Sequence, residues 1–215
     1  NGVSTTNAGY LVQNLESVNS IPFAGKIVTV SFYARAGANY SNNANGLLLN
    51  LIYGTGTDQN VLGTYTGATT VISQTATLTT TWQRFSFTGA VASTATQLTL
   101  YFQTTPVGTA GANDYFEVTG VQLEQGWVAT PFARAGGNIG GEMALCQRYY
   151  QKFQTGSGYI RFGQGLAQST TVVYITTPFT TKTRIIPSSM DYYITGNTMA
   201  VWDGVTITPI TAITT

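Results

Sequence analysis

The stretch that decides the fold is KIVTVSFYARA, residues 26–36. Its apolar side chains alternate one by one with polar or amphipathic ones, which is the period of a β-strand with one face in a hydrophobic core. The inward set is Val28, Val30, Phe32 and Ala34. Tyr33 and Arg35 are therefore expected on the outer face of the same strand.

The same β character returns in several short runs separated by Gly- and Asn-rich turns. These runs are residues 46–53 (GLLLNLIY), 82–88 (WQRFSFT), 97–103 (QLTLYFQ) and 115–124 (YFEVTGVQLE). Gly120 interrupts the last of them, which predicts a β-bulge or a close backbone approach. Several short alternating strands of this kind favour an antiparallel β-sandwich, so the fold class is all-β.

The composition restricts the chemistry of the chain. Only 8% of its residues are charged, the formal net charge is +1, and it contains no histidine and one cysteine. Histidine is the commonest general base and metal ligand, and a single thiol rules out an intrachain disulfide and a cysteine-based zinc site. With so few basic residues we expect no nucleic-acid partner, and the apolar runs are too short for membrane insertion. We therefore expect a protein that is not an enzyme and that has no cofactor.

The second part of the sequence changes character. Residues 129–141 (ATPFARAGGNIGG) contain Pro131 and Gly pairs, which are typical of a linker arm. A short helix is expected over about 141–153, followed by further short strands from 158 onward. The predicted organisation is a β-sandwich over 1–128, the arm over 129–141, and a helix with a small C-terminal β domain over 142–215. The abrupt start at Asn1 suggests a piece of a longer protein.

Two segments, one leading into the arm and one in the expected helix, resemble a known family. FEVTGVQLEQGWVATPF, residues 116–132, followed by EMALCQRYYQ, residues 142–151, is similar to a segment of bacteriophage tail-fibre proteins. Residues 23–36 and 82–87 resemble strands of carbohydrate-binding-module-like jelly rolls. The resemblance implies a jelly-roll sandwich, a short connector with a helix, and a small C-terminal β domain. It also implies a homotrimer on the virion, in contact with other virion proteins and a bacterial surface glycan.

Three sets of candidate residues follow. The alternation along the strands places several aromatic, amide and guanidinium side chains on the outer faces of the strands. Together they are expected to form one glycan-binding surface made of Tyr33, Arg35, Asn50, Tyr101 and Gln103. The alternative is that the tyrosines are ordinary cross-strand pairs or lie in a subunit contact. The broad apolar arc of the helix predicts an oligomer interface made of Met143, Leu145, Cys146, Tyr149, Tyr150 and Phe153. Trp127 is expected to anchor the arm to the sandwich.

A structural calcium ion is the third candidate. Its ligands would be Glu16, Asp114 and Glu117, because carbohydrate-binding jelly rolls often hold calcium with carboxylates near their first and last strands. The alternative is that these carboxylates are solvated or form an ion pair with Arg35 or Arg84.

The resulting hypothesis is a virion attachment protein that binds a bacterial glycan. Two alternatives stay open: a carbohydrate-binding module of a secreted glycan-degrading enzyme, and a capsid or tail decoration protein without a ligand. Oligomeric state separates the first two, since a fibre protein should trimerise and a binding module should be monomeric. Absence of any glycan affinity would favour the third.

Overall fold

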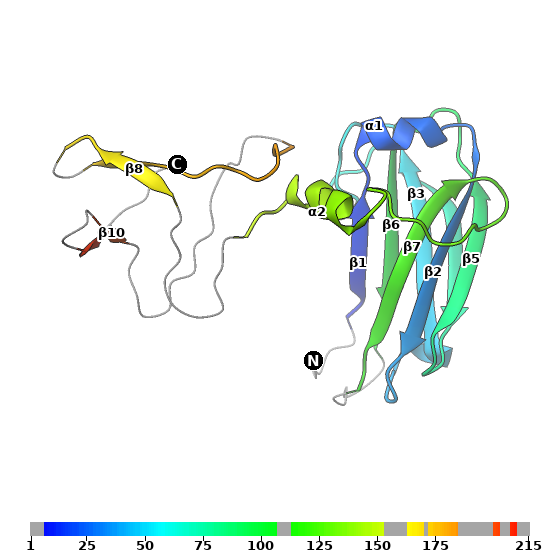
Figure 1. The fold of residues 1–215 in the computed structure, drawn as a ribbon. Coiled ribbons are helices and arrows are strands. Elements are labelled where there is room, and N and C mark those ends of the chain that lie inside the picture. The colour runs from blue at the N-terminus through cyan, green and yellow to red at the C-terminus, as the bar shows by residue number, and fades with distance from the viewer. Residues whose placement is uncertain are drawn as a thin grey trace. The chain divides into compact units, whose positions relative to one another are not determined.

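The computed structural model describes residues 7–106, 113–152, 163–169, 172–184, 200–202 and 207–209. The chain divides into two compact units, Asn1–Ala133 and Arg134–Thr215. Figure 1 shows the elements of both units. The division falls inside the stretch expected to be a linker arm.

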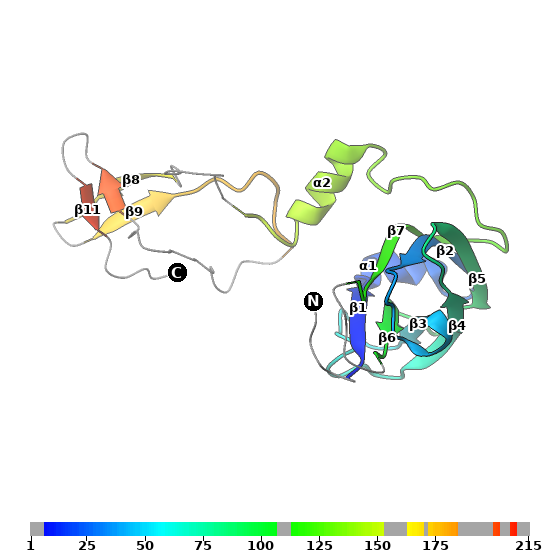
Figure 2. The same ribbon diagram turned by 90° about the horizontal axis from the view of Figure 1, so that it is seen from below.

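The first unit is an antiparallel β-sandwich of two sheets (Figures 1 and 2). One sheet has four strands in the order β1-β6-β3-β4, and the other has three in the order β5-β2-β7. The strands of the first sheet are β1 (Gly9–Asn14), β6 (Gln97–Thr104), β3 (Gly46–Gly54) and β4 (Thr69–Thr77). Those of the second are β5 (Gln83–Ala90), β2 (Ile27–Ala36) and β7 (Phe116–Gln125).

The connections wind the chain back and forth between the sheets. Among the described strands of the first unit, only β3 and β4 are consecutive and also pair within one sheet. The step from β1 to β2 is bridged by the short helix α1 (Ser17–Ser20) and the 3₁₀ helix η1 (Ile21–Phe23), and a second 3₁₀ turn, η2 (Asn43–Asn45), precedes β3. This winding of antiparallel strands confirms the predicted jelly-roll sandwich.

The core lies between the two sheets and uses the side chains that the alternation assigned to it. Phe32 is 0% exposed, as are the three other inward residues of β2. Its ring packs against Phe85, Phe87 and Phe102, with ring centroids 5.5, 6.2 and 4.9 Å away. Phe32 thus joins side chains of both sheets, which makes it the centre of the aromatic core.

The bulge expected at Gly120 is present. Gly120 has a φ of 58°, and the pairing of β2 with β7 shifts register between Ser31 and Tyr33. A Cβ atom at this glycine would lie 3.3 Å from Cδ2 of Tyr33. Glycine therefore supplies both the left-handed backbone and the room for the tyrosine ring.

The second unit contains one helix and two small hairpins among its described residues. Helix α2 spans Ile139–Gln147, and Asn138 caps it by accepting a 2.9 Å hydrogen bond from the backbone N–H of Gly141. The hairpins pair β8 (Gln164–Ala167) with β9 (Val173–Thr176), and β10 (Ala200–Trp202) with β11 (Ile207–Pro209). None of the helices in the described ranges has the length and apolar character needed to cross a bilayer.

Helix α2 ends earlier than the expected residue 153. The carbonyl of Cys146 accepts both the Tyr149 and the Tyr150 N–H, the shared bonding typical of a helix end. The next side chain, Gln151, then bonds to Thr180 and Thr181 instead of extending the helix. The chain therefore leaves the helix for a tertiary contact within its own unit.

Candidate functional site

The predicted glycan-binding residues fall into two groups on different sheets. Tyr33 and Arg35 lie on β2 of the three-stranded sheet, whereas Asn50 lies on β3 and Tyr101 and Gln103 on β6 of the four-stranded sheet. The outer faces of a sandwich point in opposite directions. The prediction of one surface shared by all five was therefore wrong, because parity shows which side of its own sheet a residue takes but not which sheet it belongs to.

The second group sits on an outer face with no charged side chain, which we call the neutral face. Strand register places Asn50 beside Tyr101 and Leu48 beside Gln103. It also places Tyr10 of β1 beside Gln103, and Thr75 of β4 beside Leu48. The outward residues of this sheet that form the neutral face are Tyr10, Val12, Asn14, Leu48, Asn50, Ile52, Ser73, Thr75, Thr99, Tyr101 and Gln103.

An aromatic pair stands on the β1 side of the neutral face. The rings of Tyr10 and Tyr101 meet edge to face, with centroids 5.9 Å apart and an interplanar angle of 65°. Tyr10 is 49% exposed, while partial burial raises the pKa of the Tyr101 hydroxyl above its ordinary value, helped by the nearby Tyr10. The pair offers apolar ring area together with two phenolic hydroxyl groups.

Asn50 lies next to this pair and is unusual for a buried polar residue. It is only 5% exposed, yet its side-chain amide makes no hydrogen bond to any residue that the structure describes. In the same described ranges, every side-chain nitrogen or oxygen fully shut off from solvent has a partner. The Asn50 amide must therefore reach solvent through its small exposed fraction, at the floor of the neutral face.

Thr99 on the same face is a buried polar residue whose side chain does have hydrogen-bond partners. It is 0% exposed, and its hydroxyl bonds to Oδ1 of Asn14 at 2.8 Å and to the Tyr65 hydroxyl at 3.1 Å. Tyr65 comes from the loop between β3 and β4, so this loop closes one end of the neutral face. Buried polar groups normally find such partners, because an unmet one costs about 1–3 kcal/mol.

A pocket of about 350 Å³ lies at the other end of the neutral face. Its lining residues are Asn42, Asn43, Ala44, Gly46, Leu48, Thr75, Gln103 and Thr105. Asn42 fixes the rim, since its Oδ1 accepts the N–H groups of Asn43 at 3.1 Å and Thr105 at 3.2 Å, and its amide donates to the Gly46 carbonyl. The sequence predicts only a turn for this Asn-rich loop, and the pocket could not be predicted from it.

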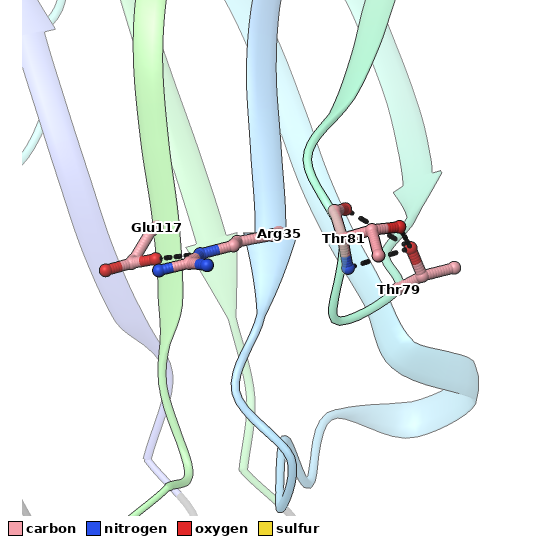
Figure 3. A network of polar contacts seen from close by, with 4 residues as sticks. All are labelled: Arg35, Thr79, Thr81 and Glu117. Carbon is pink, nitrogen blue, oxygen red and sulfur yellow. Dashed lines mark hydrogen bonds and ion pairs between the residues drawn. The ribbon is translucent and has the colours of Figure 1, made fainter.

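The opposite outer face, on the three-stranded sheet, has a different chemistry. Arg35 forms an ion pair with Glu117 of the neighbouring strand (Figure 3). Its guanidinium also lies 5.1 Å from the ring centroid of Trp82. Arg84 lies 5.9 Å from the ring centroid of Tyr33. The alternative of an ion pair with Arg35 is thus confirmed for Glu117. Both cations of this face already have partners within the sandwich.

The arm after β7 folds back along this charged face. The Glu124 carboxylate accepts the N–H of Thr130 at 2.8 Å and its hydroxyl at 2.6 Å. Oε1 of Gln122 accepts the N–H of Ala133 at 2.8 Å, and Arg84 donates to the Thr130 carbonyl. These bonds explain why the first unit extends to Ala133. Trp127 is 73% exposed, so the prediction that it anchors the arm was wrong, and Thr130 takes that part.

Contacts with the arm lower the pKa of the Glu124 carboxyl on this face. Burial acts to raise the pKa of the Glu124 carboxyl, but hydrogen bonds from Thr130 and Gln122 and the positive charge of Arg84 outweigh it and hold the pKa below its ordinary value. The arm contacts are therefore present above the ordinary pKa of a glutamate and weaken as the pH falls through the lowered value.

The proposed calcium ligands do not meet. Glu16 lies beside α1, at the end of the sandwich where β2 begins, whereas Glu117 and Asp114 lie at the end where β2 finishes. Asp114 instead accepts the N–H of Ser41 at 3.0 Å and its hydroxyl at 2.7 Å. The three-residue calcium site was therefore wrong. Within the described residues, no group of three His, Cys, Asp or Glu side chains is placed to hold a metal ion.

The predicted interface residues on and after α2 are exposed in the single chain. Tyr150 is 70% exposed and Met143 54%, and Leu145, Cys146 and Tyr149 are exposed as well. The helix has no buried residue, and its apolar side chains are spread around the axis instead of forming one stripe. Phe153 lies outside the described residues. The oligomer interface stays a prediction.

Comparison with known proteins finds solved structures that are similar to part of this chain, including the following two. No family model matches the chain, and no curated protein matches it. A structure described as "CBM4 structure and function" is 21% identical, with a TM-score of 0.38, over 54% of this chain and 61% of that one. The enzymatically active domain of tailspike protein 4 from bacteriophage CBA120 is 13% identical, with a TM-score of 0.38, over 58% of this chain and 15% of that one. The chain thus spans less than two thirds of the length of either.

Proposed function

We propose that the first unit is a non-catalytic glycan-binding module and that the neutral face is its binding surface. The observation that carries this proposal is the buried amide of Asn50, which is not used by the fold and opens onto a face with an exposed aromatic pair. A carboxamide that has no protein partner but still reaches the surface keeps its donor and acceptor available to a ligand.

The chemistry of the neutral face fits a sugar. Tyrosine rings present apolar area to the C–H face of a sugar ring, and carboxamides donate to and accept from sugar hydroxyls. Without charge, the face favours a neutral ligand, because an ionic group would lose its hydration there with no counter-charge in return. Four strands about 4.8 Å apart give a surface wide enough for more than one sugar ring.

The setting that we propose for this module is a virion attachment protein, a tail fibre or spike component that binds a bacterial surface glycan. In this setting the chain is a homotrimer and contacts other virion proteins. The exposed apolar side chains of α2 support this, since an apolar helix without a buried side is suited to packing between subunits. A module of a secreted glycan-degrading enzyme would use the same face as a monomer.

Replacing Tyr101 with alanine tests the binding surface. A glycan array probed with the full chain first identifies a ligand, and titration calorimetry then compares the variants. We expect Tyr101→Ala to weaken binding by about tenfold, corresponding to about 1.4 kcal/mol for the lost ring contact. Tyr33→Ala is the matched control on the opposite sheet and should leave the affinity unchanged. Equal losses in both variants would contradict the neutral face as the site.

Replacing Tyr150 with alanine tests assembly. Multi-angle light scattering of the full chain should show a trimer, and Tyr150→Ala should shift it toward monomer at a given concentration because an exposed aromatic of the α2 region is removed. Tyr33→Ala should assemble like the unaltered chain. A chain that is monomeric at all concentrations and still binds glycan would instead favour the module of a secreted enzyme.

A further inference from the structure

The pocket at the end of the neutral face combines apolar groups with a carboxamide, and a sugar hydroxyl alone does not complement both. Leu48 and Gln103 are register partners on β3 and β6, and Thr75 on β4 is the partner of Leu48 on its other side. Leucine and the threonine γ-methyl are apolar. The Gln103 carboxamide makes no hydrogen bond within the described part of the chain, so its donor and acceptor are both free for a ligand.

The shape of this pocket is fixed before any ligand arrives. The Asn42 side chain hydrogen-bonds three backbone groups of the rim, namely the N–H groups of Asn43 and Thr105 and the carbonyl of Gly46. Ala44 and Asn45 hold left-handed backbone, with φ of 52° and 54°. Such conformations are costly for residues other than glycine and persist only where surrounding contacts enforce them. The rim is therefore preorganised, which reduces the entropic cost of binding.

We propose that this pocket selects glycans with an acetamido substituent, as in N-acetylated amino sugars. This inference rests on the proposed glycan-binding function of the neutral face. An acetamido group has one N–H donor, one carbonyl acceptor and one methyl group. Gln103 satisfies the two polar groups, and Leu48 and Thr75 receive the methyl. A sugar with only a hydroxyl at this position places a polar group next to the apolar side of the pocket, which is unfavourable.

The spacing of the residues supports the assignment. Tyr101 and Gln103 point outward from the same strand two residues apart, which is about 7 Å. The same spacing separates Asn50 from Leu48 on β3. A sugar ring placed over Tyr101 and Asn50 thus directs a substituent into the pocket. The absence of charge among the pocket residues disfavours acidic substituents such as carboxylates, which need a cation or several N–H donors.

The test uses pairs of oligosaccharides that share linkage and length and differ only in an acetamido group or a hydroxyl. One such pair is fully N-acetylated chitotetraose and cellotetraose, and further pairs of other linkages come from the glycan array. Titration calorimetry of the full chain should show at least tenfold tighter binding of the acetamido member. Gln103→Met keeps the size of the side chain but removes its donor and acceptor, so it should reduce the preference to below about threefold.

Tyr101→Ala is the matched control. It should weaken both members of a pair equally and leave their ratio unchanged, because the ring contact does not involve the substituent. Binding of both members with equal affinity, or a preference that survives in Gln103→Met, would overturn the acetamido assignment while leaving glycan binding in place. If no glycan of any pair binds the full chain, both the assignment and the proposed function fail.

Discussion

Phe32→Ala is expected to lower the free energy of unfolding by about 3–5 kcal/mol, the usual cost of truncating a buried phenylalanine. The ring is fully buried and packs against aromatic rings from both sheets. Its removal leaves a cavity where the two layers meet, and neighbouring side chains can fill it only by leaving their own contacts. Urea denaturation of the full chain, followed by aromatic circular dichroism, measures the change.

The control for this substitution is Phe132→Ala. Phe132 lies on the arm and is 41% exposed, so its truncation should cost less than about 1 kcal/mol. A Phe32→Ala variant that unfolds at the same urea concentration as Phe132→Ala would contradict the position of Phe32 at the centre of the core.

Asn50→Leu is expected to separate stability from function. Leucine has a similar size, packs well in a strand and has no polar group to satisfy, so the variant should be as stable as the unaltered chain or about 1 kcal/mol more stable. The same substitution removes one donor and one acceptor from the binding surface. Two lost hydrogen bonds of about 1–1.5 kcal/mol each correspond to roughly a hundredfold weaker glycan binding.

Thr99→Val provides the contrast on the same face. Its hydroxyl already bonds to Asn14 and Tyr65, so valine removes both of these hydrogen bonds and should lower stability by about 1–2 kcal/mol. Urea denaturation and titration calorimetry applied to both variants give the comparison. An Asn50→Leu variant that loses stability and keeps its glycan affinity would show that Asn50 serves the fold and not a ligand.

The alternating strands could be predicted from the sequence because most of their inward positions are apolar. Strand β4 was missed for the opposite reason. Its sequence TTVISQTAT carries only Ile72 and Ala76 as buried side chains, and the inward position between them is Gln74, which is exposed. An edge strand can tolerate a polar inward residue because solvent reaches it from the side. An edge strand can therefore escape prediction when alternation of polar and apolar residues is the only criterion.

The site could be predicted in part. Asn50, Tyr101 and Gln103 were correctly placed on outward positions, but assigning Tyr33 and Arg35 to the same surface required knowing which strands pair. Strand pairing is a long-range property that parity does not contain. The pocket was missed because its rim depends on the Asn42 side chain reaching the Thr105 N–H, which lies 63 positions further along the chain.

A two-dimensional ¹H–¹⁵N NMR titration of the full chain with a glycan selected on the array tests directly whether the ligand contacts the neutral face. If it does, the side-chain amide signals of Asn50 and Gln103 and the backbone signals of Tyr10 and Tyr101 should shift with a common saturation curve. Shifts confined to residues of the charged face, such as Tyr33, or to the second unit would contradict it.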